Sequence, residues 1–119
     1  MLPLRNAIAT MVPAPDRFRG TTQRCRVETG PRAGTTFDQA FHADWSVAWR
    51  VVAGAEQGRV GRSREFCVQQ VRAELYLLAY ELAERDTLTM TLDFSTRRFV
   101  GYNIRGDRLQ PVGGSFQTL

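Results

Sequence analysis

The chain has 119 residues, which suits one domain with a single hydrophobic core. Its residues are 43% hydrophobic and 24% charged, as in ordinary globular proteins, and no apolar run approaches the roughly 20 residues of a membrane-spanning helix. The net charge of +4 comes with 16 arginines scattered along the chain and no lysine, which excludes Schiff-base chemistry through a lysine side chain. Scattered arginines are not typical of a nucleic-acid surface, so we expect neither a nucleic-acid partner nor a membrane partner.

The first 20 residues are rich in proline and show weak periodicity. We expect residues 1–20 to form an irregular, loosely attached arm, and residues 21–119 to form one domain. The apolar stretch near the N-terminus is short and is interrupted by Pro3, Arg5 and Asn6, which is a poor secretory signal. A cytoplasmic location is therefore expected.

From residue 21 onward the pattern is that of β-strands. Apolar and polar residues alternate in WSVAWRVV (45–52) and in TLTMTLDF (87–94), which predicts strands with one buried face. The nearly apolar LYLLAYEL (75–82) is compatible with a short buried helix, but its length and polar flanks favour a strand. Further strands are predicted at residues 22–28, 35–41, 64–72, 97–104 and 112–118.

Short turn-forming segments separate these predicted strands, for example GPRAG (30–34), AGAEQG (53–58) and RGD (105–107). About eight short strands at intervals of about ten residues indicate an antiparallel barrel or sandwich. The short connections favour an all-β, up-and-down barrel, and a barrel of about eight strands can hold one small ligand.

Arg59 is the strongest candidate for a site residue. On a regular strand Arg62 and Arg64 have the opposite parity to Arg59, so we expect them to face solvent while Arg59 points into the barrel. A buried guanidinium must be paired. Its partner is either a ligand carboxylate, enolate or carbonyl, or a structural ion pair with Glu56 or Glu65.

Several aromatic residues are candidates for the wall of a ligand pocket. Trp45 and Trp49 share a predicted strand face, where they either shape a cavity or fill the core. Tyr80 either donates its hydroxyl to a bound carbonyl or sits at the rim, and Glu81 is either an outward residue or an acid inside the pocket. The other residues expected to line the pocket are Phe37, Tyr76, Leu82 and Met90.

No metal or cofactor site is expected. Cys25 and Cys67 belong to no closely spaced pair, and with His42 they are too few for an ordinary zinc site of cysteine and histidine. Cys25 and Cys67 either form a single disulfide or, as we favour, are two small buried thiols, and His42 is interpreted as a solvated turn residue.

The ordered series of motifs between residues 37 and 104 is similar to a known family. It consists of an aromatic–arginine pair, a glycine turn followed by arginine, a glutamate and a strand with two tyrosines: Trp49–Arg50, Gly54-x-x-x-Gly58–Arg59, Glu65, Tyr76 and Tyr80. In this order they resemble the central part of bacterial phenolic acid decarboxylases and of the related MoaF-like proteins. Both groups are calycin-type, lipocalin-like barrels, so the resemblance implies that fold.

Carried over residue by residue, the resemblance supports a binding role for one position only. Arg59 matches the family's inward arginine that binds the substrate carboxylate region. The position of the family's catalytic glutamate is Leu82, with Glu81 one residue early, and residues 28–34 lack its paired tyrosines. The resemblance therefore does not predict phenolic acid decarboxylation, since a shared fold does not transfer chemistry.

These observations predict a small-molecule-binding barrel for a hydrophobic or aromatic molecule with a carbonyl or carboxylate. The first hypothesis is a cofactor-free lyase, isomerase or cyclase of bacterial biosynthesis, with Arg59 holding the oxygen and Tyr80 or Glu81 moving a proton. The alternative hypothesis is a carrier or sensor with the same pocket and no catalysis. A third hypothesis, which we favour less, is a nucleic-acid- or protein-binding module that uses the basic surface. A homodimer is left open.

Overall fold

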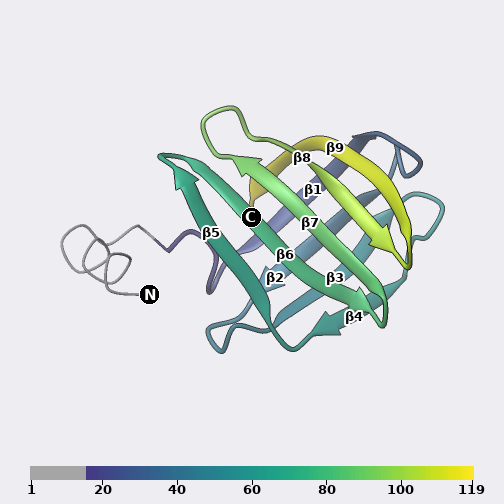
Figure 1. Ribbon diagram of the computed structural model, residues 1–119, viewed down its shortest axis with the longest axis horizontal. Coiled ribbons are helices and arrows are strands. Elements are labelled where there is room, and N and C mark those ends of the chain that lie inside the picture. The colour runs from purple at the N-terminus through teal and green to yellow at the C-terminus, as the bar shows by residue number, and fades with distance from the viewer. Residues whose placement is uncertain (1–15) are drawn as a thin grey trace.

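The computed structural model describes residues 16–119, which form nine antiparallel β-strands and no helix (Figure 1). The strands are β1 (Thr22–Thr29), β2 (Thr36–Phe41), β3 (Val47–Ala53), β4 (Val60–Ser63), β5 (Phe66–Arg72), β6 (Leu75–Ala83), β7 (Asp86–Asp93), β8 (Arg98–Arg105) and β9 (Arg108–Thr118). The expected all-β, up-and-down barrel is confirmed. Over these residues there is no helix long and apolar enough to cross a bilayer.

Pairing between the first and last strands curls the meander into a nearly closed barrel. The strand order in the sheet is β4-β3-β2-β1-β9-β8-β7-β6-β5, so the β1–β9 ladder joins the two halves. In Figure 1, β5–β8 lie in front and β1–β3 behind. At the remaining seam the Phe66 amide donates to the Trp45 carbonyl at 2.9 Å, and β4 lies close to β6. The chain thereby encloses one interior.

Period-two patterns in the sequence correspond to the inner and outer faces of the barrel. On β7 every second residue is buried, which places Leu88, Met90 and Leu92 inside and the threonines outside. The ambiguous LYLLAYEL segment is the strand β6, with Tyr76 and Tyr80 inside. A side chain at Gly101 on β8 would place its Cβ 1.9 Å from the Thr89 carbonyl oxygen, so only glycine fits this crossing.

Three local features differ from the prediction. The strand β4 was missed, because its four residues, VGRS, carry no apolar alternation. The predicted strand at 45–52 begins at Val47, because Trp45 has a φ of 72° and closes a turn in which its amide donates to the His42 carbonyl. Trp45 therefore does not share a strand face with Trp49. Cys67 is exposed rather than buried, whereas Cys25 is buried as expected.

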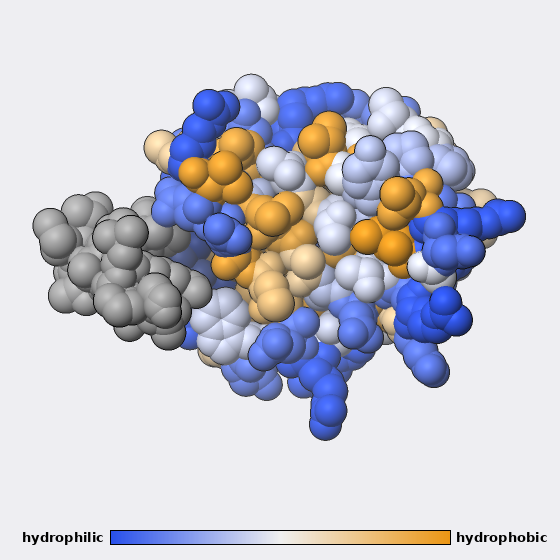
Figure 2. Space-filling model, in the orientation of Figure 1, coloured by the Kyte–Doolittle hydropathy of each residue, from blue (hydrophilic) through white to orange (hydrophobic). Residues whose placement is uncertain are grey.

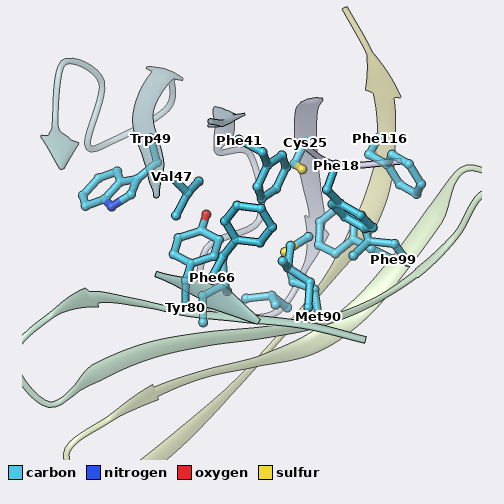
Figure 3. Packing of buried hydrophobic residues seen from close by; sticks show 14 of the residues in the cluster. Phe18, Cys25, Phe41, Val47, Trp49, Phe66, Tyr80, Met90, Phe99 and Phe116 are labelled. Atoms are coloured by element: carbon cyan, nitrogen blue, oxygen red, sulfur yellow. The ribbon is translucent and has the colours of Figure 1, made fainter. Parts of the chain in front are cut away.

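One end of the barrel is filled by aromatic side chains (Figure 3). Phe18 is 2% exposed, and its ring makes edge contacts with Phe41, Tyr76 and Phe94 at centroid distances of 5.3, 5.5 and 5.9 Å. Residue 18 falls within the segment that we expected to be a loose arm, so packing of the barrel begins before residue 21. Residues 1–15 lie outside the described part of the chain.

Candidate ligand site at the open end of the barrel

A small apolar cavity lies at the end of the barrel opposite Phe18. Its volume is about 60 Å3. The wall is made by the side chains of Phe37, Trp49, Val51, Leu82, Leu88 and Val112. The rim is polar and consists of Arg32, Thr35, Arg59 and Asn103. An apolar interior under a few polar groups is the usual make-up of a small-molecule site.

The rim carries an excess of positive charge. Arg59 Nη1 lies 3.2 Å from Glu56 Oε2, and its Nη2 lies 3.8 Å from Asp86 Oδ2. Arg32 also pairs with Glu56, and Arg105 Nη2 lies 3.4 Å from Asp86 Oδ2. Three guanidinium groups therefore share two carboxylates, and one positive charge is not neutralised.

The pKa of Arg32 reports the same imbalance. Burial lowers this pKa, and the positive charges of Arg105 and Arg59 lower it further, against the opposing effect of Asp86. An anion bound at the rim would relieve this repulsion. Arginine suits that role because its planar fork binds a carboxylate with two hydrogen bonds.

Asp86 is the anchor of the charged rim. Asp86 is the first residue of β7 and lies on the inner face, where its side chain is 7% exposed. Asn103 Nδ2 donates to Asp86 Oδ1 at 2.6 Å and to the Thr87 carbonyl at 3.1 Å, which fixes the carboxylate between two arginines. Buried charge is tolerated here because it is paired and hydrogen-bonded.

Trp49 forms the wall of the cavity next to β4. It is 7% exposed, and the Arg59 guanidinium carbon lies 5.2 Å from its ring centre. Gly61 pairs with Trp49 across β3 and β4, and a Cβ at Gly61 would lie 2.2 Å from the indole Cζ2. Glycine therefore makes room for the ring. The buried indole Nε1 has no acceptor among residues 16–119, which leaves one donor beside the cavity.

The structure brings together only some of the predicted site residues. Arg59, Trp49, Phe37 and Leu82 line the cavity. Tyr76 and Met90 lie in the packed interior, at 3% and 1% exposure. Trp45 packs against Phe66 at 5.2 Å and lies under Arg19, away from the cavity. Glu81 is exposed on the outer face of β6.

Tyr80 belongs to a buried hydrogen-bond network in the core. Its hydroxyl donates to Gln39 Oε1 at 2.7 Å, and Gln39 Nε2 donates to Gln23 Oε1 at 3.1 Å and lies 3.6 Å from Cys25 Sγ. Burial raises the pKa of Tyr80 well above its ordinary value, and burial with the nearby Asp38 charge raises the pKa of Cys25. Both groups therefore stay protonated, and neither lines the cavity.

The ion pair between Arg59 and Glu56 is one of the two pairings expected from the sequence. The other rim residues were not predicted: Arg32, Asp86, Asn103 and Arg105. Three of these four lie in or beside turns, which were interpreted only as connections. In an up-and-down barrel, however, alternate turns meet at the same end. Since β4 and β5 run in the same direction and count as one pass of the chain, the β1–β2, β3–β4, β6–β7 and β8–β9 connections share the open end. This rule would have pointed to the charged residues there.

Metal ligands are not grouped in the described part of the chain. Within residues 16–119, no three side chains of histidine, cysteine, aspartate or glutamate lie close enough together to hold a metal ion.

Comparison with known proteins shows the fold. No family model matches the chain, and no curated protein is similar enough in sequence to match. Among solved structures, the chain is similar to one from Burkholderia vietnamiensis described as "a putative beta-lactamase", with a TM-score of 0.76 and 22% sequence identity. The match covers 89% of this chain and 99% of that one. At this identity, the likeness establishes the nearly closed antiparallel barrel and nothing about activity.

Proposed function

We propose that this protein binds a small organic anion at the open end of its barrel. The apolar part of the ligand enters the cavity, and its carboxylate or carbonyl oxygen meets the arginine rim. The observation that carries this proposal is the apolar cavity beneath three guanidinium groups that share two carboxylates. Arg59 is the central contact, because it lines the cavity and its side chain is 34% exposed, so that a ligand can reach it.

The cavity volume narrows the class of ligand. An engineered apolar cavity of roughly 150 Å3 in another protein binds benzene. The cavity here is about 60 Å3, so it encloses a short branched aliphatic group, and an aromatic ring would remain partly outside it. We therefore expect short aliphatic carboxylates to bind at least as well as aromatic ones.

Binding without turnover is the role that the geometry supports best. Proton transfer requires a side chain within hydrogen-bond reach of the ligand. Tyr80 donates its hydroxyl to Gln39 inside the core, and Glu81 lies on the outer face. A carrier or sensor is therefore the first candidate. A cofactor-free lyase, isomerase or cyclase is the second, favoured by Asp86, which is the carboxylate that pairs with Arg59 at the rim.

Neither the resemblance to phenolic acid decarboxylases nor the structural similarity to the Burkholderia vietnamiensis protein indicates a specific reaction. The resemblance to phenolic acid decarboxylases retains Arg59 and lacks the tyrosine pair and the glutamate, so we do not propose decarboxylation. Penicillin-binding proteins and class A β-lactamases use a serine–lysine pair, and this chain contains no lysine. A β-lactam with a carboxylate still belongs to the proposed ligand class and is a useful probe.

The test is calorimetric titration with isovalerate, benzoate and a carboxylated β-lactam, and with isoamyl alcohol as the uncharged match of isovalerate. We expect isovalerate to bind and the alcohol to bind more weakly. In Arg59→Gln the loss of a charge-assisted contact of about 1.5–3 kcal/mol should weaken isovalerate binding roughly ten- to hundredfold.

Arg64→Gln is the matched control, because Arg64 is exposed and lies outside the cavity. Its affinity for isovalerate should equal that of the unmodified protein. Equal affinities of the acid and the alcohol, or unchanged affinity in Arg59→Gln, would overturn the proposal.

A further inference from the structure

The outer face of β6–β8 is an exposed apolar surface. Leu77, Val100 and Tyr102 are 42%, 64% and 49% exposed, and they lie on neighbouring strands in register with Thr89 and Thr91. Figure 2 shows this face toward the viewer, with hydrophobic residues gathered over the front strands and hydrophilic ones around them. We call these five residues the outer sheet patch, and we propose that it binds a second copy of this chain to form a symmetric dimer.

The charge distribution favours a partner with the same surface. The outward residues of β6–β8 carry no charge from Leu77 to Ala79, from Thr87 to Thr91 and from Val100 to Ile104. A partner with a net negative charge would leave its own charges unpaired against this face, which is unfavourable. Charges begin only at the ends of the strands: Glu81 lies at one end, and Asp93 and Arg98 lie at the other. Because the border has both signs, it can pair with itself.

The relief of the patch is complementary to itself. Thr89 and Thr91 on β7 are half-buried, while Val100 and Tyr102, their partners on β8, are 64% and 49% exposed. We therefore treat the β8 pair as a ridge and the two threonines as the trough beside it. A twofold axis between β7 and β8 places the ridge of each copy in the trough of the other. Such an isologous arrangement requires a ridge and a trough side by side in one surface, and aligned packing of two sheets at about 30° is a common geometry.

The size of the patch predicts a weak association. Strands are about 4.8 Å apart, and residues on one face follow each other at about 7 Å along a strand, which gives a footprint of about 400 Å2 per copy if the neighbouring strands contribute. Two such footprints total about 800 Å2, which is below the roughly 1,200 Å2 of stable complexes. We therefore expect a reversible dimer with a dissociation constant between roughly ten and a few hundred micromolar.

Sedimentation velocity of the full chain, from about 5 to about 500 μM, tests the proposal. The average mass should rise with concentration from monomer toward dimer. Val100→Glu places a charge in the centre of the patch and should abolish that rise, while a circular dichroism melt checks that the variant is folded. Tyr102→Arg is a second, independent substitution in the same ridge and should have the same effect.

Val60→Glu is the control, because Val60 is 67% exposed on β4, outside the patch, and matches Val100 in residue type and exposure. It should associate like the unmodified protein. A chain that stays monomeric at all concentrations overturns the proposal, and so does an association that both valine variants weaken equally. Association that persists in folded Val100→Glu and Tyr102→Arg also overturns it.

Discussion

Arg59 and Tyr80 were both candidate site residues from the sequence, but the structure gives them very different surroundings. Both are polar residues expected to face the barrel interior. Arg59 is the last residue of the turn between β3 and β4, at the open end of the barrel. There its guanidinium lies close to two carboxylates and to the Trp49 ring. Tyr80 lies deeper on β6, and its hydroxyl is held by Gln39. One is therefore available to a ligand, and the other stabilises the core.

Replacing Tyr80 by phenylalanine separates a structural role from a catalytic one. The substitution leaves Gln39 Oε1 buried without its donor, which should lower the free energy of unfolding by about 1–3 kcal/mol. Urea denaturation measures this loss, and Tyr102→Phe, at an exposed position, should change stability by less than about 0.5 kcal/mol. Affinity for isovalerate should be unchanged in Tyr80→Phe. A loss of affinity without a loss of stability would place the hydroxyl in the site.

At the scale of elements, the outer surface of β1–β3 is joined by one buried carboxylate. Arg24 donates twice to Asp38, at 2.8 and 3.0 Å, and Arg50 Nη2 lies 3.8 Å from the same carboxylate. The hydrogen bonds from Arg24 lower the pKa of Asp38 most, and the positive charges of Arg24 and Arg50 add to this effect. Three neighbouring strands thus share one ion-pair network.

This network makes a defined contribution to the pH dependence of stability. A pKa lowered by folding means that the stabilisation is complete above the unfolded value of about 4 and is lost as the pH falls through the lower, folded value. In thermal melts between about pH 2 and pH 6, Asp38→Asn should therefore melt lower than the unmodified protein near neutrality, and the gap should narrow in acid. Asp107→Asn, in the exposed β8–β9 turn, should keep the unmodified profile. A gap that is constant with pH would contradict this assignment.

For the whole molecule, the two ends of the barrel have opposite characters. The end near Phe18 is filled by rings, including the Phe94 and Phe116 pair at 5.0 Å, whereas the other end retains a cavity under charged turns. A ligand can enter only where the interior is not already filled. We therefore expect the filled end to contribute to stability and the open end to binding.

Phe18→Ala tests whether the closed end holds the barrel together. Removing a ring that is 2% exposed should cost about 3–5 kcal/mol of unfolding free energy, while Phe18→Leu, which keeps most of the volume, should cost less than about 1.5 kcal/mol. Chemical denaturation gives both values. Equal stability of the alanine variant and the unmodified protein would show that residue 18 is not part of the cooperative unit.

The fold could largely be predicted from the sequence because local patterns encode it. Alternation on β7 and turn residues between strands determine which segments are extended and which face of each is apolar. The short β4 escaped detection, since four residues without apolar alternation carry no such pattern. Trp45 was misplaced because its positive φ belongs to a turn, so that the strand begins only at Val47.

The sequence by itself determined an all-β meander with an apolar interior and an arginine, Arg59, directly after a turn. Only the tertiary structure decided that Arg32, Arg59 and Arg105 meet around one cavity, because they are far apart in the chain and converge through closure of the barrel. Tertiary packing also decided how much of the interior stays empty. Alternation says which side chains point inward, and only their combined volumes in three dimensions determine what space remains for a ligand.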